Sequence, residues 1–240
     1  MHTSRFLKVS AAASALALSA AGASAATLDL TADSPANAGT LAGVGYTISA
    51  VGGALDNAQS YDGGQPTPTG DLADELAFER DGYGVDGDEI TLADPAEAIV
   101  IAFDSVVRLT GVAFLDLFND EYTDLASQRT THVRNDAGDL FEVSDEFAEL
   151  LVDGVSAFYV DSVDNLGAGA GYAEATGLSF VGQTFTFQVG TASTQNDGSG
   201  APDFALAGIQ VAAVPVPAAG LLLLGALGGL GAAARRRRRG

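Results

Sequence analysis

Apolar and polar residues alternate with a period of two in several stretches of this chain, which is the pattern of half-buried β-strands. The alternation is clearest at residues 44–49 and 184–189. Residues 98–103 instead form a continuous apolar run, which suits a strand covered on both faces. Further strands are predicted at residues 106–118, 130–134, 139–143, 155–160 and 204–211.

The segments between these strands are rich in Gly and Asp, as turns are. Two of them, residues 71–80 and 145–151, have the composition of short helices, although neither is long enough to form a helical layer. Many short strands joined by such turns predict an all-β fold. We expect an antiparallel, jelly-roll-like β-sandwich that spans residues 26–213.

The composition narrows the chemistry of this domain. The chain has 240 residues, 47% of them hydrophobic, which is enough for one domain with a core. It contains no Cys and no Trp. The lack of Cys excludes disulfides, thiolate zinc sites and cysteine catalysis, and the lack of Trp removes the usual platform for sugar stacking.

The first 25 residues have the layout of a secretory signal peptide. Arg5 and Lys8 precede an apolar stretch at residues 9–21, and small residues stand at Ala23 and Ala25. We therefore expect a signal peptidase to cleave the exported chain after Ala25.

The chain ends in an apolar segment followed by arginines. Residues 218–234 are uncharged, and as a helix they would span about 26 Å, just enough to cross a hydrocarbon core. The positive-inside tendency keeps the arginines in the cytoplasm, so residues 26–213 are expected on the far side of the inner membrane. This topology anchor consists of Arg235, Arg236, Arg237, Arg238 and Arg239.

A proline motif, made of Val214, Pro215, Val216, Pro217 and Ala218, lies at the start of this tail. Proline lacks a backbone donor and restricts the residue before it, so we expect an extended strip. The motif, the apolar span and the final arginines together resemble the VPLPA-CTERM branch of PEP-CTERM sorting signals, with Val216 where that branch has Leu. The resemblance implies processing by an exosortase and a place at the cell surface, or in the exopolysaccharide matrix, of a Gram-negative bacterium. A plain C-terminal membrane anchor is the alternative.

Two internal segments also resemble PEP-CTERM ectodomains. They are residues 82–103, in which a Gly-Tyr-Gly-Val loop and acidic residues precede a strand, and residues 202–209. This resemblance implies a β-sandwich and assigns no activity.

The region between the two ends is strongly acidic. All 31 Asp and Glu residues lie between Asp29 and Asp203, whereas four arginines are the only basic residues left there, which gives a net charge of −27. Such a field repels nucleic acid and attracts cations. We therefore expect no nucleic-acid partner and interpret most of the acids as surface solvation.

The densest acidic loop offers a candidate calcium site. Asp86, Asp88 and Glu89 are close in sequence and flanked by glycines, and calcium prefers several oxygen ligands. The spacing is not that of an EF-hand, and an acidic β-turn is the competing interpretation. Glu97 and Asp203 would join the site only if the fold brings them together.

Candidate catalytic residues are few. His132 is the only histidine in residues 26–213, and its alternating segment predicts a place on a polar surface. No Gly-x-Ser-x-Gly elbow accompanies it. Tyr83, in the densest acidic loop, and Tyr122, in a second acidic loop at residues 119–124, are the tyrosines to test for sugar stacking, although loop packing is the favoured interpretation for both.

These observations favour a non-enzymatic structural or adhesive protein that is exported and sorted to the cell surface. Its expected partners are signal peptidase, an exosortase and extracellular polysaccharide. One alternative is a calcium-dependent glycan-binding module, and another is a secreted polysaccharide hydrolase.

Overall fold

The computed structural model describes residues 24–57, 68–86, 89–92, 96–119, 131–143, 146–164, 171–191 and 202–214, together with Ala226 and Arg235. Residues Ala23–Val214 form one compact unit. The described elements are β1 (Ala25–Asp29), β2 (Ala38–Leu41), β3 (Val44–Val51), β4 (Leu55–Asp56), the 3₁₀ turn η1 (Ala73–Glu75), β5 (Gly84–Val85), β6 (Ile90–Thr91), β7 (Ala98–Leu115), β8 (Phe118–Asn119), β9 (Thr131–Arg134), β10 (Leu140–Val143), β11 (Phe147–Val152), β12 (Val155–Asp161), β13 (Val163–Asp164), β14 (Ala173–Val189) and β15 (Asp203–Ala213).

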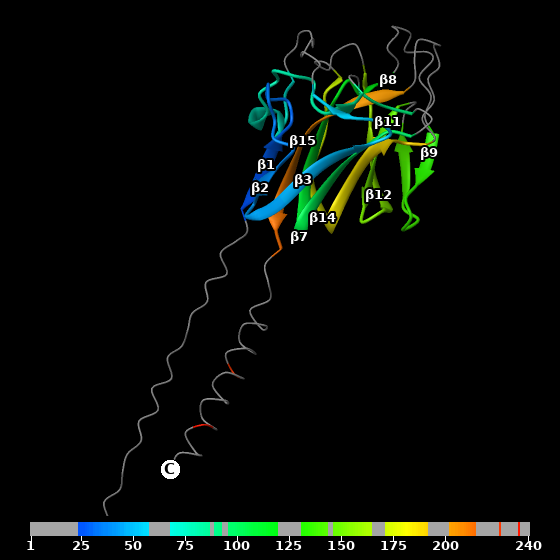
Figure 1. Cartoon of the computed structure of the whole chain (residues 1–240). Coiled ribbons are helices and arrows are strands. Elements are labelled where there is room, and N and C mark those ends of the chain that lie inside the picture. Colours follow the sequence, from blue (N-terminus) through cyan, green and yellow to red (C-terminus); the bar gives the residue numbers. More distant parts are fainter. Residues whose placement is uncertain are drawn as a thin grey trace, which may run out of the picture. The chain divides into compact units, whose positions relative to one another are not determined.

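The prediction of an all-β, antiparallel domain is confirmed for the described residues, in which the short β8–β13 pair is the only parallel pairing (Figure 1). The two predicted helices are wrong. Residues 71–80 contain only the single turn η1, and residues 147–152 are strand β11. Strand β11 pairs with β12 on one side and β14 on the other, so its tertiary neighbours override the helix preference of its Ala, Glu and Leu residues.

Two long strands, β7 and β14, organise the main sheet, whose strand order is β1-β15-β7-β14-β11-β12. The first part of β7 pairs with β3, and the last part pairs with β15. Strand β14 follows β7 through both parts, with register shifts near its middle. The sheet therefore branches at β7, so that β3 and β15 occupy the same side of β7 at successive stretches.

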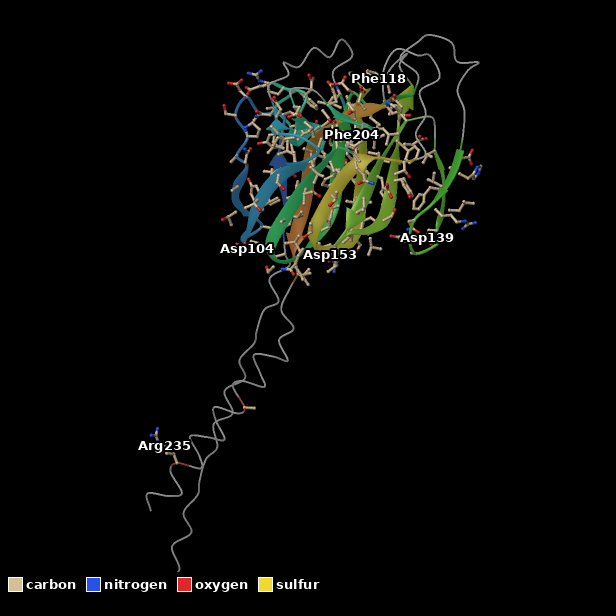
Figure 2. The ribbon with its side chains drawn as sticks, turned by 45° about the vertical axis from the view of Figure 1, so that its right-hand side comes forward. Asp104, Phe118, Asp139, Asp153, Phe204 and Arg235 are labelled. Carbon is tan, nitrogen blue, oxygen red and sulfur yellow. The ribbon has the colours of Figure 1, made fainter. Side chains whose placement is uncertain are left out.

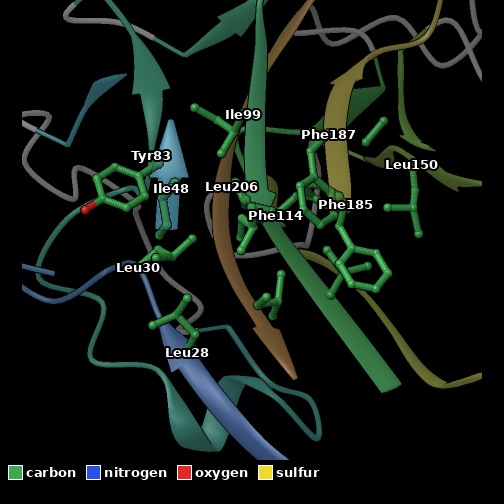
Figure 3. Packing of buried hydrophobic residues seen from close by; sticks show 14 of the residues in the cluster. Leu28, Leu30, Ile48, Tyr83, Ile99, Phe114, Leu150, Phe185, Phe187 and Leu206 are labelled. Carbon is green, nitrogen blue, oxygen red and sulfur yellow. The ribbon is translucent and has the colours of Figure 1, made fainter. Parts of the chain in front are cut away.

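The main core lies between two parts of this sheet, because the sheet folds back on itself. Side chains from both halves of β7 and from β1, β3, β11, β14 and β15 form one buried cluster (Figure 3). Ile99 and Phe114, near opposite ends of β7, are both members and at most 1% exposed. The two halves of the long strands thus belong to two layers that face each other.

A smaller apolar cluster covers the outer face of β7 and β15. It is formed where the segment around η1 packs on the sheet, and its members are Leu72, Ala73, Leu76, Ala113, Leu115, Tyr172 and Ala207. Residues 111–115 are consequently buried on both faces, whereas Val100 and Ala102 are half-exposed. The prediction of two-sided burial at residues 98–103, made from their continuous apolar run, is therefore wrong.

The free edge of β12 is partly covered by the β9–β10 ribbon. The Asp136 amide donates to the Ser156 carbonyl oxygen (3.0 Å), and the Ser156 amide donates to the Asp136 carboxylate (2.9 Å). The Asn135 side chain also donates to the Ala157 carbonyl oxygen (2.8 Å). These bonds occupy backbone groups that an edge strand would otherwise expose to another chain.

The domain has two distinct ends. The exit end is where Ala25 pairs with Ala212 and Ala213 pairs with Val107. It carries the short turns at residues 42–43 and 153–154 and residues 104–106 of β7, which have no register partner in β3, β14 or β15. At the opposite end, which we call the loop end, β7 begins and finishes and β15 begins. Figure 2 shows Asp104 and Asp153 at the exit end and Phe118 at the loop end.

Candidate functional site

Asp86, from the candidate calcium loop, has a structural role in the described structure. It follows β5 with a left-handed φ of 56°. Its backbone amide donates to the Ala54 carbonyl oxygen (2.8 Å), and its carboxylate accepts a hydrogen bond from the Ala54 amide (2.6 Å). Asp86 therefore fastens the β4–β5 connection through both its backbone and its side chain.

The fold brings Glu97 and Asp203 to the same residue, Thr91. The Glu97 carboxylate accepts hydrogen bonds from the Thr91 amide and hydroxyl, both at 2.8 Å. Asp203 is the register partner of Thr91 in the β6–β15 pair. Glu89, two residues before Thr91 in the sequence, is partly buried. Asp88 lies outside the described residues. Within the described residues, no three His, Asp or Glu side chains are arranged to hold a metal ion.

Tyr83 is a core residue, which agrees with the favoured interpretation as a packing residue and contradicts the alternative of sugar stacking in an open loop. Its side chain is 1% exposed, and it bridges to Leu206 of β15. Its hydroxyl lies 3.1 Å from the Pro35 carbonyl oxygen and also contacts the Asn37 side-chain oxygen. Burial raises the pKa of Tyr83 to about 12. The other candidate, Tyr122, lies outside the described residues.

His132 lies on the surface, as the alternation of its segment predicts. It stands opposite Glu142 in the β9–β10 ribbon, with 3.9 Å between its Nε2 and the nearer carboxylate oxygen. The two side chains are 56% and 69% exposed. An ion pair this open to solvent contributes little to stability.

A groove of about 360 Å³ opens between β12 and the first residues of β14, and no sequence pattern predicts it. Two of its residues, Val160 and Ala173, belong to the main core, so its floor is apolar. The described lining contains no His, Ser, Cys or Lys, and its polar side chains are those of Thr, Tyr, Asp and Glu. It consists of Thr69, Phe158, Tyr159, Val160, Asp161, Val163, Tyr172, Ala173, Glu174 and Ala175.

Glu174 holds the segment that borders this groove. Its carboxylate accepts hydrogen bonds from the amides of Asp71 (2.7 Å) and Leu72 (2.9 Å) and from the Tyr172 hydroxyl (2.6 Å). The pKa of Tyr172 is raised. Burial of its hydroxyl is the largest cause, and the hydrogen bond to Glu174 is the second. No local pattern predicts this cluster, because Glu174 and its amide donors are far apart along the chain.

Both expected processing sites are next to the β1–β15 pair. Ala25 is the first residue of β1, and Val214 directly follows β15. Ala23 and residues 215–218 and 236–239 lie outside the described residues, and Arg235 is exposed and helical. No helix in the described part of the chain has the length and apolarity that a membrane crossing requires.

Comparison with known proteins gave no match to any family model, curated protein or solved structure.

Proposed function

We propose that this chain is an exported bacterial protein that is sorted through its C-terminal tail and acts, without catalysis, as a structural or adhesive component of the cell surface or its matrix. In this proposal the two facing layers are a jelly-roll-like β-sandwich ectodomain. Residues 1–25 are a signal peptide, and residues 214–240 are a VPLPA-type sorting signal for an exosortase.

The observation that carries the proposal is the pairing of the first strand with the last. Ala25 of β1 and Ala212 of β15 are register partners, so the chain enters and leaves the domain at the exit end. If the domain is attached to the surface through Val214, its exit end faces the attachment point. The loop end, with the longer connections between strands, then faces away from it. This arrangement suits a module that is displayed on a surface.

The charge of the domain also suits this role. Four arginines accompany 31 carboxylates, and at least two of these arginines already have partners in the protein. Arg80 binds the Asp33 carboxylate at 2.6 Å, and Arg134 donates to the Gly138 carbonyl oxygen at 2.7 Å. A surface with this excess of negative charge stays hydrated and repels polyanions.

The proline motif gives the direct test. In a Gram-negative host that contains an exosortase, the mature protein should begin at Ala26 and lack the arginine cluster. The double variant Pro215→Ala/Pro217→Ala should be exported but should keep its tail, as measured by intact mass. Pro202→Ala is a matched control, because Pro202 precedes β15 at the loop end. Normal tail removal in the double variant would refute the proposed sorting signal.

A further inference from the structure

The expected cleavage site for signal peptidase lies inside a strand pair. Ala25 is paired with Ala212, and Ala26 with Val211, in the antiparallel β1–β15 register. The ladder continues past β1, where the Leu30 amide donates to the Ala207 carbonyl oxygen at 3.0 Å. Among the described strands, β15 is the only one that pairs with β1. The peptide bond between Ala25 and Ala26 is therefore part of a ladder formed with the last strand of the domain.

Side-chain contacts also hold β1 in place. Leu28 and Leu30 are 8% and 0% exposed, and Ala26 packs against the main core. The Asp29 carboxylate accepts hydrogen bonds from the Thr31 amide (2.8 Å) and the Ala77 amide (3.0 Å). A peptidase that must surround an extended segment cannot do so while that segment is paired and packed in this way.

We propose that docking of β15 closes the N-terminal processing site, so that cleavage after Ala25 has to precede completion of the sheet. This inference rests on the proposed function. Strand β1 is the first strand to be synthesised and exported, whereas β15 is the last. Strand β1 therefore has no strand partner until the rest of the domain has been exported. A precursor that folds before cleavage becomes resistant to the peptidase.

Purified bacterial signal peptidase and the full chain in detergent micelles provide the test. One sample of the chain is refolded first, and another is diluted from urea directly into the peptidase. The rate at which a product beginning at Ala26 appears is followed by mass spectrometry. We expect the refolded chain to be cleaved at least about tenfold more slowly than the freshly diluted chain, because cleavage then requires local opening.

Two variants loosen the β1–β15 pair, and a third serves as the control. Leu28→Ala removes a core contact of β1, and Leu150→Ala removes another buried leucine, which belongs to β11. Gly208→Ala places a methyl group 3.0 Å from the Leu28 carbonyl oxygen and 2.8 Å from Leu76 Cδ2. After refolding, the Leu28 and Gly208 variants should be cleaved several-fold faster than the Leu150 variant.

The outcomes separate this inference from the proposed function. Equal cleavage of the refolded and freshly diluted wild-type chains would overturn the inference and leave export intact. Equal rates for the Leu28, Gly208 and Leu150 variants would show that β1–β15 pairing is not the barrier, which also overturns it. If even the freshly diluted chain is not cleaved after Ala25, the proposed export signal is wrong and the inference falls with it.

Discussion

Phe114 and Phe187 pack edge to face, with 6.2 Å between their ring centroids, although they belong to opposite layers of the domain. Phe187 is the register partner of Ile99, near the start of β7, whereas Phe114 lies near its end. A straight strand of 18 residues would be about 60 Å long at about 3.3 Å per residue. The contact therefore requires β7 to reverse direction, which it does at the exit end.

This aromatic contact should couple the two layers energetically. Phe114→Ala and Phe187→Ala should each lower the free energy of unfolding by about 3–5 kcal/mol, because both rings are fully buried. The double variant should lose less than the sum, by about 0.5–1.5 kcal/mol, as measured by urea unfolding. Phe187→Ala combined with Phe141→Ala in the β9–β10 ribbon should be additive. Additivity for the Phe114–Phe187 pair would contradict a direct contact between the layers.

Asp153 should stabilise the turn of the sheet at the exit end. Its Oδ1 accepts hydrogen bonds from the amides of Gln183 (3.0 Å) and Thr184 (2.9 Å), where the β7–β14 register shifts. Asp153→Ala should cost about 0.5–1.5 kcal/mol in urea unfolding. Asp153→Asn keeps an acceptor oxygen and tolerates the left-handed φ of 51°, so it should lose less than half as much. Equal losses for Ala and Asn would show that these hydrogen bonds contribute nothing.

Strands with alternating residues could be predicted from the sequence, because their pattern depends on one buried face. Residues 44–49 and 184–189 fall within β3 and β14 for this reason. The joining of residues 98–103 and 106–115 into the single strand β7 could not be predicted, because the pairing of its two halves depends on β3 and β15, which lie far away in the chain. Strand β11 was missed because its sequence locally favours a helix, whereas its two strand neighbours decide the outcome.

The candidate site was harder to predict than the fold. A glycine-flanked Tyr83 has the local sequence of an open loop, and only its bridge to Leu206 places the ring in the core. The roles of Glu97 and Glu174 depend on hydrogen bonds that each carboxylate accepts from backbone amides. Such hydrogen bonds leave no pattern in sequence, because any residue except proline can supply the amide.

The buried hydroxyl of Tyr83 should make stability depend on alkaline pH. The pKa of Tyr83 is raised to about 12 in the folded protein, against about 10 in the unfolded chain. The unfolded state therefore releases this proton first, and the stabilisation present below pH 10 is lost as the pH rises toward about 12. Tyr83→Phe should lower stability at pH 8 by about 1 kcal/mol and flatten the decline above pH 10. The measurement is urea unfolding from pH 8 to 11.

Tyr159 offers a comparison for that experiment. Its pKa is also raised by burial, yet its hydroxyl contacts Ser156, Glu149 and the Arg134 carbonyl oxygen near the β9–β10 ribbon. Tyr159→Phe should therefore leave most of the alkaline decline due to Tyr83 in place. An unchanged pH profile in Tyr83→Phe would contradict the assignment.

Asp86 should act on stability through Ala54 rather than through calcium. Asp86→Ala removes the 2.6 Å hydrogen bond from the Ala54 amide and should cost about 0.5–1.5 kcal/mol. Because this bond needs no cation, the loss should be the same with calcium, with magnesium and with chelator, all at constant ionic strength. Thermal unfolding of the wild-type and variant chains under the three conditions measures it. A saturable rise in melting temperature that calcium alone produces, and that Asp86→Ala abolishes, would instead establish a calcium site at the loop end, since binding to the folded state stabilises it by linkage.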